Sequence, residues 1–319
     1  MKKILIVLTI TVLLAASSSD SDPAATNGGR RVPLQVRGYI ADTPLGITRA
    51  AGTAWDTGDR IGLYALPHDD TTTPIEDGSN VCYVLAGTTG STNGSKYEAF
   101  TSTTAINLPD DGSFIDVYGY YPYSDLATPT TVAVNLSTQD PQKNIDLMTT
   151  GQVSTSTHNG STPISINNPS CQLLFRHRLT KLVFNLKFDD FGVIKNTSLT
   201  IGNQKTTATY NIYTDALTYS GGEANQTITA AVGSTKSGFD KTFEAIVLPN
   251  DTDNNPAIDC KVTIVVDGKS YSFTIIRTGE ASNIQVLTGS FFAGRKYEYN
   301  VTVYPFTIEV DTEKYTEQW

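Results

Sequence analysis

The most regular feature of the chain is the alternation of apolar and polar residues in short runs. From Val32 onward these runs are rich in β-branched and aromatic residues, and glycine, asparagine, aspartate and proline separate them. Runs bounded by turn formers predict strands, and no stretch has the longer period of an amphipathic helix. We therefore predict an all-β protein. The expected strands cover residues 32–40, 59–66, 81–86, 114–123, 131–136, 179–188, 207–213, 242–248, 260–266, 269–276, 295–303 and 304–310.

The alternation also indicates which face of each strand is buried. Side chains of one parity point to one face, so an apolar row of one parity predicts a buried face. We expect two cores, a first around Trp55, Ile61 and Leu63 and a second around Phe175, Leu182, Phe184 and Leu186. Two further apolar rows lie near the ends of the chain: Val32, Leu34, Val36 and Ile40, and Tyr304, Phe306, Ile308 and Val310.

A polar stretch with prolines from Thr149 to Ser170 separates the strands into two groups, each large enough for a β-sandwich. We expect an N-terminal sandwich over residues 50–165 and a C-terminal sandwich over residues 166–319. In the second group, Asp267-Gly268 lies between two strands. This pair predicts a type I′ hairpin, because that turn needs a positive φ at both central residues.

The first residues are typical of an export signal. Lys2 and Lys3 precede an apolar run over residues 4–14, which is too short to span a membrane. Residues 1–17 are therefore predicted to be a signal peptide, and residues 18–49 a polar tether that includes the strand at 32–40. The signal is typical of lipoproteins, but Ser17 stands where the lipid-bearing cysteine belongs. Either an ordinary signal peptidase cuts nearby, or a change from cysteine to serine blocks lipidation, and both routes export the chain.

Charge and cysteine content narrow the class of protein. With 23 Lys and Arg against 32 Asp and Glu, the net charge is −9, so no general basic surface is available to a phosphate backbone. Nucleic acid is therefore not an expected partner. Cys82, Cys171 and Cys260 stand far apart in strand-like sequence. This favours buried free thiols, with a single disulfide as the open alternative.

No group of residues has the sequence spacing of a catalytic or metal site. His68 and His158 lie in polar loops. His177 lies in a strand-like segment, where a bond to the backbone and a role as general base with distant partners both stay open. Residues 251–255 imitate the start of a calcium loop, but Pro256 replaces the glycine that the loop needs. We expect no enzyme activity, no catalytic residue, no metal and no cofactor.

A series of segments along nearly the whole chain carries a family resemblance. After the exported leader come ITRAAGTAWDTGDRIGLYAL (47–66), YGYYPYS (118–124), NIDLMTT (144–150), LLFRHRLTKLVFNL (173–186), AIVLP (245–249) and AGRKYEYNVTV (293–303). In their order and spacing they resemble the fimbrillins, the pilin subunits of type V pili, and the related fimbrillin-like lipoproteins. Ser17 is the main departure from the family pattern.

This resemblance implies a subunit of two transthyretin-like β-sandwich domains in tandem, made as an exported precursor. In such pilins a protease cuts after an arginine, the first strand leaves, and the vacated groove accepts a C-terminal strand from a neighbouring subunit. Arg49 followed by Ala50 matches the cut in position and type, so residues 32–40 hold the removable leader strand. The row from Tyr304 to Val310 is then the donor strand. Its parity changes afterwards, which predicts a bend and a second docking segment with Tyr315 and Trp319.

A chain with both a groove and a donor strand is expected to be a stalk subunit. Its partners are then copies of itself and related pilins in a cell-surface fimbria that serves adhesion, and the precursor contacts the outer membrane only through a lipid anchor. The alternative is a secreted or surface-attached β-sandwich that binds glycans through exposed aromatic residues, for which 16 Tyr and 12 Phe are candidates. A hydrolase is the third interpretation, and no catalytic constellation supports it.

Overall fold

The computed structural model describes residues 31–41, 54–70, 72–85, 87, 97–125, 127–128, 131–153, 162–220, 225–250, 259–275, 291–311 and 317–318. These residues form β-strands and their connections. The part of the chain that the structure describes has no α-helix and includes a short 3-10 helix, η1 (Gln142–Asn144). The all-β prediction is confirmed. Within the same residues, no helix has the length and apolar character to cross a membrane.

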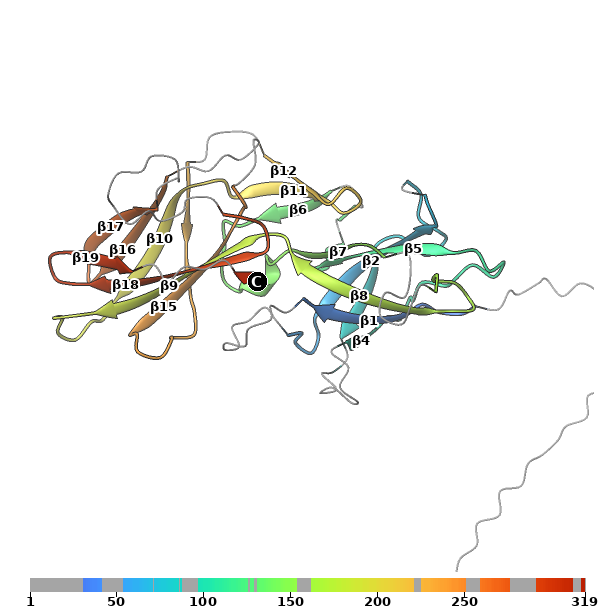
Figure 1. Ribbon diagram of the computed structural model, residues 1–319, viewed down its shortest axis with the longest axis horizontal. Coiled ribbons are helices and arrows are strands. Elements are labelled where there is room, and N and C mark those ends of the chain that lie inside the picture. The colour runs from blue at the N-terminus through green and yellow to red at the C-terminus, as the bar shows by residue number, and fades with distance from the viewer. Residues whose placement is uncertain are drawn as a thin grey trace, which may run out of the picture. The chain divides into compact units, whose positions relative to one another are not determined.

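The first sheet closes into a barrel (Figure 1). The prediction that Trp55, Ile61 and Leu63 share a core is confirmed, because all are buried in the cluster that the barrel strands form. The Trp55 ring centroid lies 5.1 Å from that of Phe100, edge to face. The strand order is β1-β4-β3-β2-β5-β7-β8, with β1 Gln35–Ile40, β2 Arg60–Pro67, β3 Val81–Leu85, β4 Glu98–Thr101, β5 Ile115–Tyr121, β7 Met148–Val153 and β8 Ser170–His177.

The prediction that Phe175 belongs to the second core is wrong. This residue lies on β8, which pairs with β1 and β7 and completes the barrel. Its ring is 5.1 Å from that of Trp55, centroid to centroid. The division into units 50–165 and 166–319 stays a prediction, and any boundary in this region has to leave β8 with the barrel.

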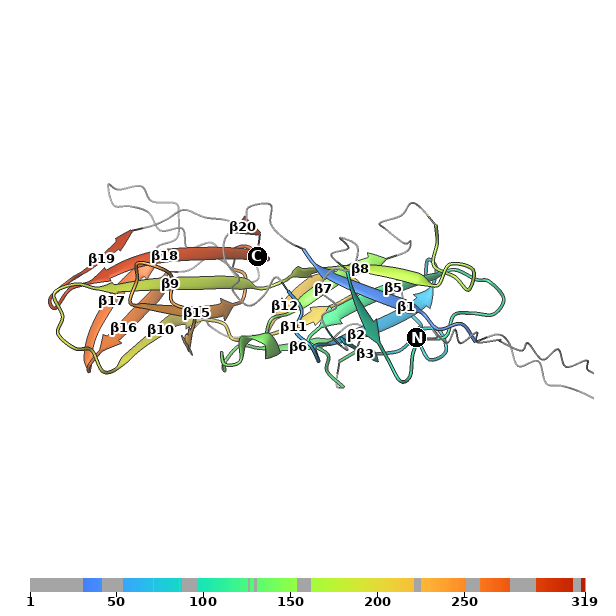
Figure 2. The same ribbon diagram turned by 90° about the horizontal axis from the view of Figure 1, so that it is seen from below.

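Two further sheets enclose the second core (Figure 2). Leu182, Phe184 and Leu186 are fully buried in it, as predicted. The sheet named here the β9 sheet has the order β14-β15-β9-β18-β19, with β20 also on β18. Its strands are β9 Thr180–Phe188, β14 Ala231–Val232, β15 Lys241–Val247, β18 Arg295–Val303, β19 Ile308–Asp311 and β20 Glu317–Gln318. The β16 sheet has the order β13-β10-β16-β17, with β10 Thr197–Gln204, β13 Gln226–Thr229, β16 Cys260–Val266 and β17 Lys269–Ile275.

The turn between β16 and β17 has the predicted hairpin geometry. Val266 pairs with Lys269, which leaves Asp267 and Gly268 as the central residues. Their φ values are 46° and 86°, so both lie in the positive region that a type I′ turn requires. The hairpin prediction is confirmed.

A smaller sheet, the β11 sheet, joins one strand from the N-terminal half of the chain with two strands from the C-terminal half. Its order is β12-β11-β6, with β6 Val132–Asn135, β11 Thr207–Asn211 and β12 Ala216–Tyr219. Val134 of β6 and Tyr210 of β11 pack in one apolar cluster with Tyr64 of β2 and with Tyr118 and Tyr120 of β5. This sheet therefore packs against β2 and β5 of the barrel, on side chains that the first core does not use.

The cysteines carry free thiols, as predicted. Cys171 and Cys260 are buried, and burial raises the pKa of each thiol to about 12. A thiol with so high a pKa stays protonated at neutral pH and is a poor nucleophile. Cys82 is half-buried, which differs from the expected burial.

Candidate functional site

The predicted leader strand lies inside the barrel wall. Leu34, Val36 and Ile40 are 3%, 4% and 2% exposed, and Val32 packs against the same core while half-buried. The alternate residues Gln35 and Arg37 face solvent. The alternation in the sequence therefore located the buried row correctly. The removal of this strand stays a prediction.

The backbone of β1 is bound on both sides. On one side Val36 pairs antiparallel with Phe100 of β4. On the other side the pairing with β8 is parallel and continuous from Gln35, opposite Ser170, to Ile40, opposite Phe175. The N–H of Leu34, just before β1, donates to the carbonyl oxygen of Ile106 at 2.8 Å. Because β4 and β8 each use one edge on β1, the strand closes the barrel.

Gly38 is a further inward-facing position of this strand. It has the same parity as Val36 and Ile40, so the alternation in the sequence already placed it on the inward face. A Cβ atom at this position would lie 2.9 Å from Cε2 of Phe100 and 3.4 Å from Cε2 of Phe175. The two rings therefore cover the backbone of Gly38. The slot that β1 fills has room for apolar side chains on either side of one small residue.

The burial of β1 indicates how firmly it is held. Fully burying an aliphatic side chain contributes about 1.5–3 kcal/mol, so Leu34, Val36 and Ile40 together contribute about 5–9 kcal/mol as an upper estimate. The ladder hydrogen bonds to β4 and β8 add to this. β1 is therefore not expected to leave the barrel spontaneously.

The predicted donor strand begins later than expected. Residues 304–307 form a turn in which the N–H of Tyr304 donates to the carbonyl oxygen of Thr307 at 2.8 Å, and β19 begins at Ile308. The prediction of a strand over 304–307 is wrong. Pro305 has no N–H to give to a ladder, which is the signal that could have located the turn. Phe306, at the turn, is 92% exposed, and Lys269 Nζ lies 4.7 Å from its ring centroid.

β19 is held more loosely than β1. Its partner in the sheet is β18, where Val301 pairs with Val310 and Val303 with Ile308. Ile308 and Val310 touch the second core while only half-buried. Beyond it, β20 also pairs with β18, with Gln318 opposite Arg295. The described C-terminal strands thus line one edge of the β9 sheet.

The remaining predicted site residues lie outside the described residues. These are the processing residues Arg49 and Ala50, the anchor position Ser17, and Tyr315 and Trp319 of the second docking segment. His158 and the calcium-like residues 251–255 also lie outside them. Their predicted roles stay predictions.

His68 forms a polar cluster with a carboxylate that the sequence analysis missed. Asp116 on β5 is fully buried, and His68 Nδ1–H donates to its Oδ1 at 2.9 Å. Asp116 Oδ2 accepts from the Asp69 N–H at 3.1 Å and from Gln152 Nε2 at 2.9 Å. The position of Asp116 within an otherwise apolar and aromatic strand, FIDVYGYY, was the available signal. A buried carboxylate with several donors is a structural element that fixes the turn at residues 67–70.

His68, Asp69 and Asp116 also offer ligand atoms within 4.8 Å of one another. We nevertheless expect chelation with EDTA to leave the Tm unchanged, because both oxygens of Asp116 already accept hydrogen bonds from the protein. Thermal unfolding with and without EDTA measures this. A fall of several degrees that added zinc or calcium restores would contradict it, since a metal that binds the folded state raises the Tm.

A second prediction concerns pH. The hydrogen bond to Asp116 raises the pKa of His68 above its ordinary 6.5. The charged ring is thus favoured in the folded state, and its contribution to stability is fully present below pH 6.5 and is lost as the pH rises through the raised pKa. We expect the gap in unfolding free energy between the parent and His68→Gln, which keeps an N–H donor, to narrow from pH 5.5 to 8.5. Parallel pH profiles of the two proteins would contradict this.

His177 is buried on β8, and its Nδ1 lies 2.8 Å from Oδ1 of Asp146. The structure thus gives this ring a carboxylate partner, and the backbone bond considered from the sequence stays a prediction. Next to it, Arg178 Nη2 lies 2.9 Å from Oδ1 of Asp215, in the turn between β11 and β12. These two pairs connect the end of β8 to Asp146, just before β7, and to Asp215, between β11 and β12. Their role is therefore structural.

Comparison with known proteins identifies the chain. The model of the fimbrillin-like family matches residues 48–319. The chain belongs to the fimbrillin-like family. The resemblance inferred from the sequence segments is therefore confirmed, and the matched range begins after the strand β1.

Several relatives of this fimbrillin-like chain are known. A Bacteroides uniformis protein assigned as fimbrium subunit Fim1C is 32% identical over 323 residues, which cover 98% of this chain and 93% of that protein. A crystal structure assigned to a cell adhesion protein of Bacteroides uniformis has a TM-score of 0.67 at 27% identity, over 93% of this chain and 100% of that one. A second such structure, from Bacteroides ovatus, has a TM-score of 0.65 at 19% identity, over 91% and 98% of the chains, and shows the shared fold.

Proposed function

We propose that this protein is a structural subunit of a cell-surface fimbria, assembled by strand exchange after proteolysis at Arg49. In this proposal β1 leaves the barrel and the C-terminal strand of a neighbouring copy takes its place. One observation carries the proposal: a buried strand that closes the barrel lies entirely before residue 48, where the family match begins.

The edges next to β1 support this proposal. Loss of β1 would leave the N–H and C=O groups of β4 and β8 unpaired along the slot. Such edges accept an added strand, with main-chain bonds giving affinity and alternate side chains setting the register. The slot beside β8 is six residue pairs long, from Gln35 to Ile40. A donor that covers residues 304–311 has the length to fill it, and because this segment has no glycine, its insertion requires the ring of Phe100 to move away from the position of Gly38.

The state of the C-terminal strand supports the donor role. Phe306 is exposed, and Ile308 and Val310 are only half-buried, so this segment loses less apolar burial on release than β1 does. β19 also lies at the edge of its sheet, where release breaks one ladder. After insertion these side chains would gain burial in the neighbour's barrel. Exchange of β1 for a donor strand is then favourable once the tether is cut.

The place of the subunit in the fimbria follows from its two proposed roles, accepting a strand and donating one. A subunit that can both accept and donate a strand fits the stalk, and its partners are copies of itself and related pilins. The precursor would be exported and held at the outer membrane through a lipid anchor, and the assembled fimbria would serve adhesion. Each subunit would consist of two transthyretin-like sandwiches in tandem.

Limited trypsin treatment of the purified precursor tests this function. We expect a stable fragment that begins at Ala50, identified by mass spectrometry, and ladders on a non-boiled SDS gel together with filaments in electron micrographs. The untreated protein, kept for the same time, is the control and should stay monomeric. A trimmed protein that begins at Ala50, has lost β1 and still stays monomeric would overturn the proposal.

A further inference from the structure

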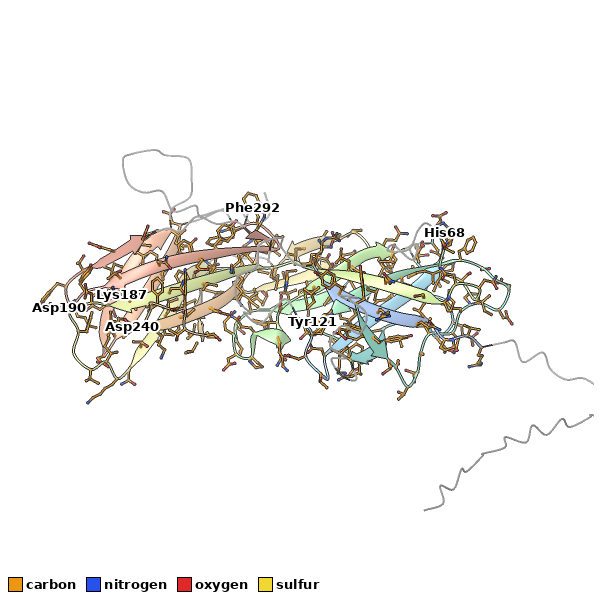
Figure 3. The ribbon with its side chains drawn as sticks, turned by 60° about the horizontal axis from the view of Figure 1, so that its bottom comes forward. His68, Tyr121, Lys187, Asp190, Asp240 and Phe292 are labelled. Atoms are coloured by element: carbon orange, nitrogen blue, oxygen red, sulfur yellow. The ribbon has the colours of Figure 1, made fainter. Side chains whose placement is uncertain are left out.

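A pocket of about 410 Å³ opens between the β9 sheet and the β16 sheet. This volume is within the usual range of small-molecule sites. The pocket lies where β9 ends, β10 begins and β15 begins, so both sheets contribute to it. Lys187, Asp190 and Asp240 mark this end of the β9 sheet in Figure 3. The lining residues are Phe188, Phe191, Gly192, Ile194, Lys195, Thr197, Asp240 and Lys241.

Contacts within the protein hold the walls of this pocket in place. Asp240 Oδ2 accepts from the N–H of Phe188 at 2.7 Å, which ties β15 to the end of β9. On the opposite wall, Asp267 Oδ1 accepts from the N–H of Lys195 at 3.1 Å and of Asn196 at 2.8 Å. The ring of Phe191 lies 6.0 Å from that of Phe188, centroid to centroid. A site whose walls are already ordered loses little entropy when a ligand binds.

The charges at the pocket favour an anion. Lys195 and Lys241 bring positive charge, and Asp240 is the acidic residue of the lining. Among the residues that the structure describes, neither ammonium group has a carboxylate partner. Asp240 Oδ1 has no hydrogen-bond donor within the same residues, because the bond to Phe188 uses Oδ2. The lining residues thus carry one net positive charge in a chain of net charge −9, and the nearby Asp267, which is not a lining residue, uses its carboxylate on the N–H groups of Lys195 and Asn196.

The apolar part of the lining points to the rest of the ligand. Phe188 and Phe191 are half-buried, so each ring has one side on the core and part of its surface toward solvent. An aromatic face can stack on the C–H groups of a sugar ring, while a carboxylate oxygen such as Asp240 Oδ1 accepts from sugar hydroxyls. A lysine ammonium binds a carboxylate through charge-assisted hydrogen bonds. We propose that this pocket binds an acidic saccharide, a sugar ring that carries a carboxylate.

None of the residues that line the pocket belongs to β1 or to residues 304–311, although the lining residue Phe188 pairs with Val303, just before that segment. In the β9 sheet, β18 lies between β9 and the terminal strand β19, and the pocket uses β9 and β15 on the other side. β1 belongs to the barrel and contributes no lining residue. Saccharide binding would therefore add a ligand to the fimbrial subunit without using its assembly surfaces, and the monomer should show it.

The test measures binding of methyl β-D-glucuronide and N-acetylneuraminic acid to the full chain by titration calorimetry and saturation-transfer NMR. Methyl β-D-glucoside, which lacks the carboxylate, is the matched sugar. We expect the acidic sugars to bind and the neutral sugar to bind about tenfold more weakly. Lys195→Met and Lys241→Met should each weaken the acidic sugars by a similar factor and leave the neutral sugar little changed.

Lys187→Met is the control variant, because Lys187 is an exposed lysine on β9 that does not line the pocket. Its affinity should equal that of the parent, and thermal unfolding should show that all three variants are folded. The proposal is overturned if the acidic sugars do not bind at millimolar concentration, if both pocket variants bind them like the parent, or if an acidic peptide alone binds. If the processed protein forms filaments but does not bind the acidic sugars, only the saccharide proposal is wrong. If it binds the acidic sugars but forms no filaments, only the assembly proposal is wrong.

Discussion

Replacing Arg49 with alanine is expected to abolish filament formation and to leave a folded monomer. The inward side chains of β1 contribute about 5–9 kcal/mol of burial, and an uncut tether returns the strand to its slot at millimolar effective concentration. No donor strand at micromolar concentration competes with that. Electron microscopy and non-boiled SDS gels after protease treatment measure the loss. Arg31→Ala, in the same leader, is the matched control and should assemble like the parent.

A mixing experiment makes this test sharper. Arg49→Ala keeps residues 304–319 and should donate a strand but not accept one. A variant that lacks residues 304–319 should, after processing, accept a strand but not donate one. Each alone is expected to stay monomeric, and the mixture should form one-to-one complexes without filaments. If Arg49→Ala assembles as readily as the parent, the strand-exchange mechanism is wrong.

Replacing Phe184 with alanine is expected to lower the unfolding free energy by about 3–5 kcal/mol. Phe184 lies on β9, is fully buried, and stacks on Tyr299 of β18 with ring centroids 5.2 Å apart. It also meets Phe273 of β17 at 6.4 Å, so its removal leaves a cavity between the two sheets. Urea unfolding followed by tryptophan fluorescence and circular dichroism measures the change.

Phe306→Ala is the matched control for this prediction. The same side chain is deleted, but Phe306 is 92% exposed, so the expected change is about 0.5 kcal/mol or less. Equal effects of the two substitutions would mean that the alternation on β9 does not define the core. A loss of filaments in Phe306→Ala, without a loss of stability, would instead support the donor role of this segment.

The pattern along the chain was sufficient for features that depend on near neighbours in sequence. Alternating parity identified the buried row of β1 and the core-facing row of β9, because successive side chains of a strand point to opposite faces, but it did not show that the other face of β9 is buried as well. Asp267-Gly268 identified its hairpin, because few residues adopt a positive φ easily. The order of short segments identified the family. Each of these signals is local, or is a series of local signals.

The pattern of apolar and polar residues did not determine which strands pair when they are distant in the sequence. An apolar residue such as Phe175 suits either core. The alternation along its strand would also be the same whether β8 paired with β1 or with a strand of the second half. The β11 sheet likewise unites β6 and β11, whose sequences show only that each is a strand. Several pairings satisfy the same row of apolar residues. Which of them forms depends on how well the whole set of side chains packs.

The features that bear on function divide in the same way, into those that the sequence determined and those that the tertiary structure decided. The sequence by itself determined an all-β fold and a buried apolar row over residues 32–40, since parity and turn formers record these directly, and its series of segments carried the resemblance to the fimbrillins. Only the tertiary structure decided that β1 closes a barrel, that Asp116 meets His68, and that Phe188, Lys195 and Asp240 line one pocket. Those residues are distant in sequence, and only the register of the sheets brings them together.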